Sequence, residues 1–131
     1  MSSNALLKVI GINLLRRKTE VKNEPVINVV ATQCKPEDEE KFNKWYNEVH
    51  IPMIMKFKGI SEVTRYKLPT DSDEYPKYLT IYKYDNQEAL KASQTSPEMA
   101  AVMAETRETW KDGMFTIKWR VSYETIQNWK R

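Results

Sequence analysis

The sequence is poor in the residues that form most recognisable site motifs. Its 131 residues include one cysteine, one histidine and three glycines. With a single cysteine, Cys34, no disulfide can form within the chain, which fits a reducing compartment. One histidine and one cysteine in different segments give no zinc-ligand spacing, and three scattered glycines form neither a phosphate-binding loop nor a G-x-S-x-G elbow. We therefore expect no metal and no bound cofactor, although a carboxylate metal site, a flavin or a haem on His50 would leave no signature in these counts.

Long apolar runs are missing as well. The longest apolar region covers residues 5–15 and is interrupted by Lys8, Gly11 and Asn13. A membrane-spanning helix needs about 20 apolar residues. The basic residues 16–18 follow this region, which is the reverse of the order in a secretory signal. We therefore expect no membrane segment and a cytoplasmic location.

The length predicts one domain with a leader and a short tail. We assign residues 1–24 to the leader, 25–127 to the domain and 128–131 to the tail. The leader is too apolar for a free tail, so it is expected to form an extra strand or helix docked on the domain or on a partner subunit. A helix lying on a membrane surface is the alternative.

Hydrophobic periodicity predicts two copies of a strand–helix–strand unit. Strands are expected over residues 26–34, 60–68, 77–84 and 114–126, and helices over 36–57, 87–94 and 97–111. Pro52 should break or kink the first helix near His50. Gly59 and Gly113 occupy equivalent helix-to-strand junctions, which indicates a pseudo-repeat. The β-α-β-β-α-β order predicts an α+β, ferredoxin-like fold, with helices on one face of a four-stranded antiparallel sheet.

The last strand suggests how the two faces of this sheet differ. Its apolar alternate residues are expected to face the helices: Phe115, Ile117, Trp119, Val121 and Tyr123. The opposite face would then carry amphipathic side chains: Thr116, Lys118, Arg120, Thr80, Tyr82 and Tyr66. Either a second subunit covers that face, or it stays open and binds something flat and anionic.

One segment resembles a known family. Residues 42–52 read FNKWYNEVHIP, which resembles the F-x-x-W-Y-x-x-x-H-x-P segment of EthD-like members of the dimeric α+β barrel superfamily. The resemblance implies a homodimer joined sheet to sheet into an α+β barrel. It implies less about chemistry, because relatives include cofactor-free cyclases, isomerases and monooxygenases, and a shared fold does not fix function.

His50 is the main candidate for chemistry, because histidine alone titrates near neutrality without perturbation. It would border a pocket between the first helix and the sheet and act as general acid or base. Alternatively, it caps the helix by bonding a carbonyl that Pro52 leaves free. A substrate-binding set is also expected: Trp45, Tyr46, Tyr66, Tyr82, Trp119 and Arg120. The aromatics could equally be core, and Arg65 and Arg120 could bind a substrate carboxylate or form surface salt bridges.

Three functions fit these features. The first is a small-molecule enzyme or binder, such as a cofactor-independent isomerase, cyclase or monooxygenase acting on a hydrophobic compound. The second is a noncatalytic, ligand-sensing or stress-related dimer. The third is an RNA-recognition domain, but residues 77–82 lack both glycines of its motif and the net charge is only +3. We expect a homodimer with a small hydrophobic or aromatic ligand and no nucleic-acid partner.

Overall fold

A computed structural model describes residues 23–131, so the predicted leader lies outside the described residues except for its last two. The strands are β1 (Val26–Cys34), β2 (Ile60–Lys67), β3 (Tyr78–Tyr84) and β4 (Phe115–Glu124). The helices are α2 (Glu39–Trp45), α3 (Ile51–Ile54), α4 (Gln87–Ser93) and α5 (Pro97–Thr109), with a 3-10 turn at Pro36–Asp38 and a π-helical turn at Tyr46–His50. The antiparallel sheet has the order β2-β3-β1-β4, which confirms the ferredoxin-like prediction.

Local sequence signals account for the starts of α4 and α5. The side chains of Asn86 and Ser96 accept hydrogen bonds from the backbone N–H groups of Ala89 and Met99. These bonds satisfy donors that the first helical turn leaves free. Pro97 occupies the first turn of α5, where a missing N–H costs nothing.

Pro52 was predicted to break or kink the first helix; the helix continues past it, with a changed hydrogen-bond pattern just before it. Proline has no N–H to donate to the carbonyl of Glu48, and its ring crowds that carbonyl. The helix widens instead into a π-helical turn, in which the Ile51 N–H donates to the Tyr46 carbonyl. Such turns are rare and often occur at functional sites. Here the turn contains both Tyr46 and His50.

The two junction glycines serve different purposes. Gly113 follows α5 with a φ of 69°, a conformation that few other residues adopt. Gly59 lies in a tight space, because a Cβ atom there would come within 2.6 Å of the Phe57 ring and 2.9 Å of the Ala89 methyl. The pseudo-repeat therefore places glycine twice, once for backbone conformation and once for packing.

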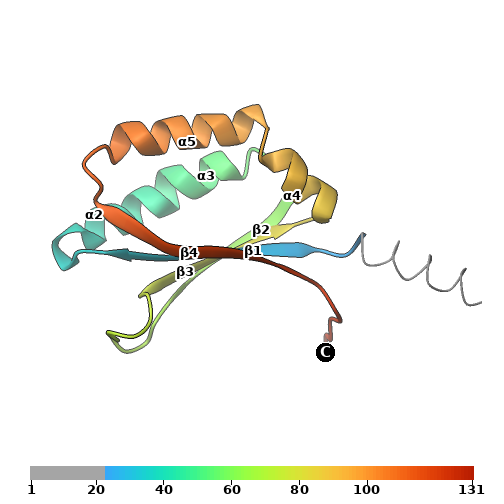
Figure 1. The fold of residues 1–131 in the computed structure, drawn as a ribbon, viewed down its shortest axis with the longest axis horizontal. Coiled ribbons are helices and arrows are strands. Elements are labelled where there is room, and N and C mark those ends of the chain that lie inside the picture. Colours follow the sequence, from blue (N-terminus) through green and yellow to red (C-terminus); the bar gives the residue numbers. More distant parts are fainter. Residues whose placement is uncertain (1–22) are drawn as a thin grey trace, which may run out of the picture.

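All of the helices labelled in Figure 1 lie on one face of the sheet, and no layer formed by residues 23–131 covers the other face. Two buried clusters lie between helices and sheet. One joins the sheet to α3, α4 and α5: Val26, Val30, Ile54, Ile60, Tyr82, Tyr84, Leu90 and Val102. The other is largely aromatic: Cys34, Phe42, Trp45, Tyr46, Tyr78 and Trp110. No helix within residues 23–131 is long and apolar enough to cross a membrane.

A β-bulge in β4 makes the predicted face assignment wrong. Ile117 pairs with Thr32 and Trp119 pairs with the neighbouring Ala31, so Lys118 is an extra residue. Because alternate residues face opposite sides, one extra residue reverses the pattern beyond it. Phe115 and Ile117 face the helices as expected, but Trp119, Val121 and Tyr123 face away, and Arg120 faces the helices.

The strand register also shows that the predicted face of two β3 residues is wrong. Thr80 pairs with Val30 and Tyr82 pairs with Asn28, on the helix-covered side. Both were expected on the other face, yet they are only 0% and 5% exposed. Tyr66 pairs with Leu79 and lies on the uncovered face, as predicted.

The uncovered face, which we call the open face, is rich in aliphatic and aromatic residues. By register it consists mainly of Ile27, Val29, Ala31, Tyr66, Leu79, Ile81, Trp119, Val121 and Tyr123. Beyond β4, the chain continues to the C-terminus on the side of this face (Figure 1) and carries Ile126 and Trp129, which are 98% and 82% exposed. The open face is therefore far more apolar than the amphipathic surface that the sequence predicted.

Candidate functional site

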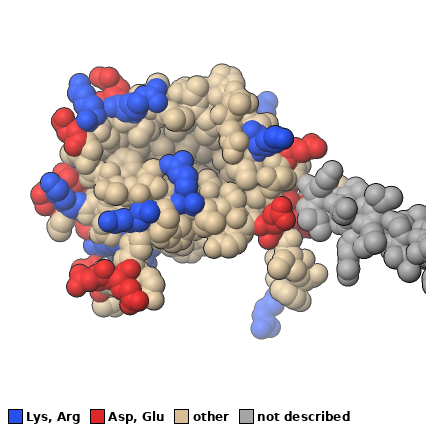
Figure 2. All heavy atoms as spheres, in the orientation of Figure 1, with Lys and Arg blue, Asp and Glu red and all other residues tan. Residues whose placement is uncertain are grey.

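A cavity of about 720 Å³ lies between the helices and the sheet. That volume is typical of sites for small molecules. Figure 2 shows a hollow in the surface between α5 and the sheet, in the region of this cavity. Its walls are mostly apolar and include Val30, Ile54, Leu90, Met99, Val102, Met103 and Ile117, with polar groups from Thr32, Tyr46, His50, Tyr82, Arg107 and Arg120.

Tyr46 and Tyr82 form a buried hydroxyl pair at this cavity. Their oxygens lie 2.6 Å apart, and the two residues are 2% and 5% exposed. Burial, together with the neighbouring Tyr46, raises the pKa of Tyr82 well above 10, so Tyr82 stays protonated at neutral pH. One proton is used in the bond between the two oxygens. The hydroxyl that accepts this bond keeps its own proton, which it can donate to a ligand.

His50 lines the same cavity and has one nitrogen without a hydrogen-bond partner among the described residues. Its ring stacks on Trp45 at 4.6 Å and meets the edge of Tyr46 at 4.8 Å. Its Nδ1 atom is buried and has no hydrogen-bond partner among the described residues, so this atom does not cap the helix. Burial lowers the pKa of His50 from 6.5 to about 4, although the charge of Glu105 acts in the opposite direction. The imidazole is therefore neutral at pH 7.

Trp45 supports His50 from outside the cavity. It is 6% exposed, and its indole N–H donates to the Glu105 carboxylate of α5 at 2.9 Å. Thr109 also donates a hydrogen bond to that carboxylate. Trp45 thereby links α2 to α5 and holds the ring on which His50 stacks. It does not line the cavity as the predicted substrate-binding set had it.

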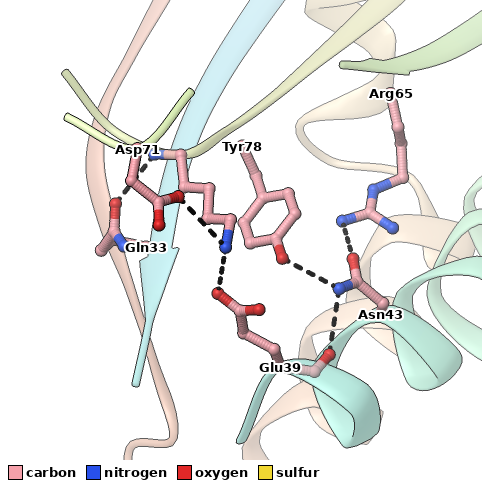
Figure 3. A network of polar contacts seen from close by, with 7 residues as sticks. Gln33, Glu39, Asn43, Arg65, Asp71 and Tyr78 are labelled. Atoms are coloured by element: carbon pink, nitrogen blue, oxygen red, sulfur yellow. Dashed lines mark hydrogen bonds and ion pairs between the residues drawn. The ribbon is translucent and has the colours of Figure 1, made fainter. Parts of the chain in front are cut away.

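Arg65 lies against the ring of Tyr46, with 4.2 Å between the guanidinium carbon and the ring centre. It donates hydrogen bonds to the side-chain oxygens of Asn43 at 2.9 Å and Asn47 at 2.7 Å. Figure 3 shows its guanidinium turned toward Asn43, which donates in turn to the Tyr78 hydroxyl. Arg65 is half-buried, and desolvation lowers the pKa of its guanidinium.

The Arg65 surroundings form a second, more polar hollow of about 420 Å³. An ion pair closes one side of it, with Lys77 Nζ 2.6 Å from the Glu39 carboxylate and 3.5 Å from that of Asp71 (Figure 3). Arg65, held by the two asparagine side chains, packs on Tyr46 and helps to fix its position. No three His, Cys, Asp or Glu side chains within residues 23–131 cluster as a possible metal site.

The structure brings together four of the seven predicted site residues. Tyr46, His50, Tyr82 and Arg120 line the cavity. Trp45 lies behind His50. Tyr66 and Trp119 lie on the open face and are 51% and 45% exposed.

Sequence reasoning missed the contribution of α5 to the cavity. Met99, Met103 and Arg107 line it at intervals of four residues, which places them on one side of the helix. Met99 and Met103 belong to an apolar stripe that the sequence of this helix shows. The spacing was visible, but nothing in the sequence showed that this stripe faces a space rather than packed side chains.

The fold and the cavity define a ferredoxin-like α+β protein with a ligand-sized space between helices and sheet. Residues 26–130 match the model of a family described as a domain of unknown function, DUF4286, and the chain belongs to that family. None of the curated proteins matches the sequence.

Solved structures share this fold at low identity. An EthD family protein from Bacillus halodurans is 18% identical with a TM-score of 0.57, over 77% of this chain and 99% of its own. A dimeric protein of unknown function and ferredoxin-like fold from Bacteroides fragilis gives 19% and 0.53, over 77% and 96%. The heme-degrader MhuD from Mycobacterium tuberculosis, solved with two hemes in its active site, gives 13% and 0.60, over 80% and 99%. These likenesses confirm the EthD-like resemblance as one of fold.

Proposed function

We propose that this protein binds a small hydrophobic or aromatic compound in the cavity and moves a proton on it. The observation that carries the proposal is the meeting of two complementary groups in one apolar space. His50 offers a neutral nitrogen without a partner, and the Tyr46–Tyr82 pair offers a hydroxyl proton. A base and a donor on one small molecule are the requirements of proton abstraction next to a carbonyl or on a phenol.

The chemistry follows from these groups. His50 would accept a proton from an acidic C–H or O–H of the ligand, while the tyrosine pair donates a hydrogen bond to the oxygen on which negative charge develops. The new imidazolium and the oxyanion then stabilise each other, which offsets the burial that disfavours a charged His50. Return of the proton to a different atom completes an isomerisation. The same deprotonation begins a cofactor-independent cyclisation or oxygenation.

We also propose that the protein is a homodimer joined through the open face. An exposed patch of large apolar side chains favours association, and a stable interface buries about 800 Å² on each partner. Trp119, Tyr123 and the exposed Trp129 are the large aromatic side chains that interfaces favour. The similar structure described as dimeric, from Bacteroides fragilis, supports a dimer but does not bear on which face forms it.

Proton exchange on a probe ketone tests the catalytic part. The probe is 2-tetralone, an aromatic ketone with exchangeable C–H groups, followed by NMR in D₂O. We expect the protein to accelerate exchange at least about tenfold over buffer. His50→Phe, which keeps a ring on Trp45 but no nitrogen, and Tyr82→Phe should each remove most of the acceleration. Tyr75→Phe is the matched control, because Tyr75 is 60% exposed and far from the cavity lining.

The outcomes separate the candidate functions. Loss of exchange in His50→Phe and Tyr82→Phe, with Tyr75→Phe unchanged, supports proton transfer. Saturable binding of the ketone without accelerated exchange contradicts it and favours the noncatalytic, ligand-sensing dimer. Absence of both binding and exchange contradicts the proposed ligand class as well.

A further inference from the structure

The charged side chains that line the cavity are all of one sign. Two arginines line it, Arg107 from α5 and Arg120 from β4, and no aspartate or glutamate does. Both arginines are exposed, so they lie where the cavity meets solvent. Figure 2 shows Lys and Arg side chains on both sides of the hollow. A mouth with two cations and no anion attracts negatively charged ligands.

Neither arginine forms an ion pair with another described residue. Among residues 23–131, the ion pairs involve Lys77, Lys83 and Lys111, and none involves Arg107 or Arg120. They come from opposite walls, a helix and a strand, and an anion between them would relieve the repulsion of like charges. The planar guanidinium suits a carboxylate, which it binds with two parallel hydrogen bonds.

Two uncharged polar atoms of cavity-lining residues lack hydrogen-bond partners. Thr32 Oγ1 and His50 Nδ1 are buried polar atoms without partners among the described residues, and both residues line the cavity. A buried polar atom without a partner costs free energy, which a ligand hydroxyl or carbonyl would recover. The lining also includes the buried apolar side chains of Ile54, Leu90 and Val102.

We infer that the ligand is an amphipathic carboxylic acid with an apolar, aromatic-sized body. Arg107 and Arg120 bind its carboxylate at the mouth, and a hydroxyl or carbonyl at its other end reaches His50 and Thr32. The inference rests on the proposed function, since it assigns the ligand class of the same cavity. It adds a carboxylate subsite and a direction of binding.

Matched ligands test the inference by calorimetric titration. The probes are 6-hydroxy-2-naphthoate, its neutral amide 6-hydroxy-2-naphthamide, and 2-naphthoate, which lacks the hydroxyl. We expect the hydroxy acid to bind at least about tenfold more tightly than the amide, because hydrogen bonds between charged groups contribute more free energy than those to a neutral amide. Added salt should reduce the ratio of acid affinity to amide affinity, because salt screens the charges of the exposed arginines. Loss of the ligand hydroxyl should weaken binding about fivefold.

Two variants place the carboxylate. Arg107→Gln and Arg120→Gln should each reduce the acid-to-amide ratio at least about threefold while leaving amide binding unchanged. Arg131→Gln makes the same chemical change at an exposed terminal residue outside the cavity lining and should have no effect. All three positions are exposed, so the variants are expected to fold, and thermal unfolding checks this.

The failures are distinguishable. Equal affinity for the acid and the amide in the unaltered protein overturns the carboxylate subsite but leaves a cavity for aromatic compounds. An acid preference that persists in both arginine variants overturns the assignment of Arg107 and Arg120. Tighter binding of 2-naphthyl phosphate than of 2-naphthoate replaces the carboxylate with a phosphate ester. Absence of binding by all of these probes removes the proposed ligand class together with the inference.

Discussion

The two faces of the sheet differ in what covers them. The helix-covered face carries the buried core residues Val26 and Val30 together with the cavity-lining residues Thr32, Tyr82 and Arg120. The open face carries many aliphatic and aromatic residues, and none of residues 23–131 forms a layer over it. A sheet face that is apolar must be buried against another element to be stable. This difference underlies the two proposals, a ligand for the cavity and a second chain for the open face.

The largest expected effect comes from a charge on the open face. Ile81 lies on a central strand of that face and is only partly exposed. Ile81→Asp should abolish the dimer, because a buried carboxylate at an apolar interface has no partner. Sedimentation equilibrium should then give the 15.5 kDa of one chain rather than twice that mass.

Met55→Asp is the control for that experiment. Met55 is an exposed apolar residue outside the open face, following α3, and its substitution should leave the dimer mass unchanged. A monomeric unaltered protein at micromolar concentration would contradict the role assigned to the open face and leave the cavity as the only functional region proposed.

The next effect concerns His50 and pH. Its pKa is about 4 in the folded protein and 6.5 in the unfolded chain, so the unfolded state binds the proton more readily between these values. Stability is therefore fully present above pH 6.5 and falls as the pH drops toward 4, by about 3 kcal/mol. Urea unfolding at fixed protein concentration measures this loss. His50→Phe should lack this part of the acid sensitivity, whereas equal pH slopes in the two proteins would contradict a buried, neutral imidazole.

The tyrosine pair should give an effect of about 2 kcal/mol. Tyr82→Phe removes one hydroxyl and leaves that of Tyr46 buried without its partner, which costs about 1–3 kcal/mol of unfolding free energy. Tyr84→Phe is the matched control on the same strand and face. Its residue is equally buried at 5% exposed, so a comparable loss there would show that the bond between the two hydroxyls contributes little.

The smallest effect tests the electrostatics behind His50. The Glu105 carboxylate raises the pKa of His50 against the effect of burial, so Glu105→Gln should lower that pKa further below its usual value. The glutamine oxygen can still accept the Trp45 N–H, which preserves the packing. Because His50 is the only histidine, the NMR titration of its imidazole is free of overlap. An unchanged or raised midpoint would mean that Glu105 does not act on the cavity.

The elements were predictable because their signals are local. The strand over residues 26–34 has the predicted ends, and Asn86 and Ser96 cap helices as their positions indicate. Pro52 indicated where the first helix becomes irregular. It did not indicate that the irregularity is a π-helical turn, because that depends on the packing of Tyr46 and His50.

The faces of the sheet were less predictable, because a β-bulge changes which face a residue lies on without interrupting the alternation of apolar and polar residues in the sequence. Residues 115–123 show unbroken alternation, yet an extra residue at Lys118 divides them between the two faces. The prediction for Tyr82 was wrong for a related reason. Tyrosines alternate with aliphatic residues along β3, and the more polar tyrosine side was assigned to the uncovered face. The pairing partners Asn28 and Val30 decide the matter, and pairing is not a local property.

The bulge has a consequence for how this chain can misfold. Phe115 and Ile117 close the floor of the cavity, while Trp119 and Tyr123 point to the opposite side. If β4 paired with β1 one residue out of register beyond Lys118, Trp119 would enter the cavity and Arg120 would leave it. The same error would remove aromatic residues from the contact surface. A misregistered edge strand would therefore yield a chain that neither binds its ligand nor assembles, although its sheet and helices would still be formed.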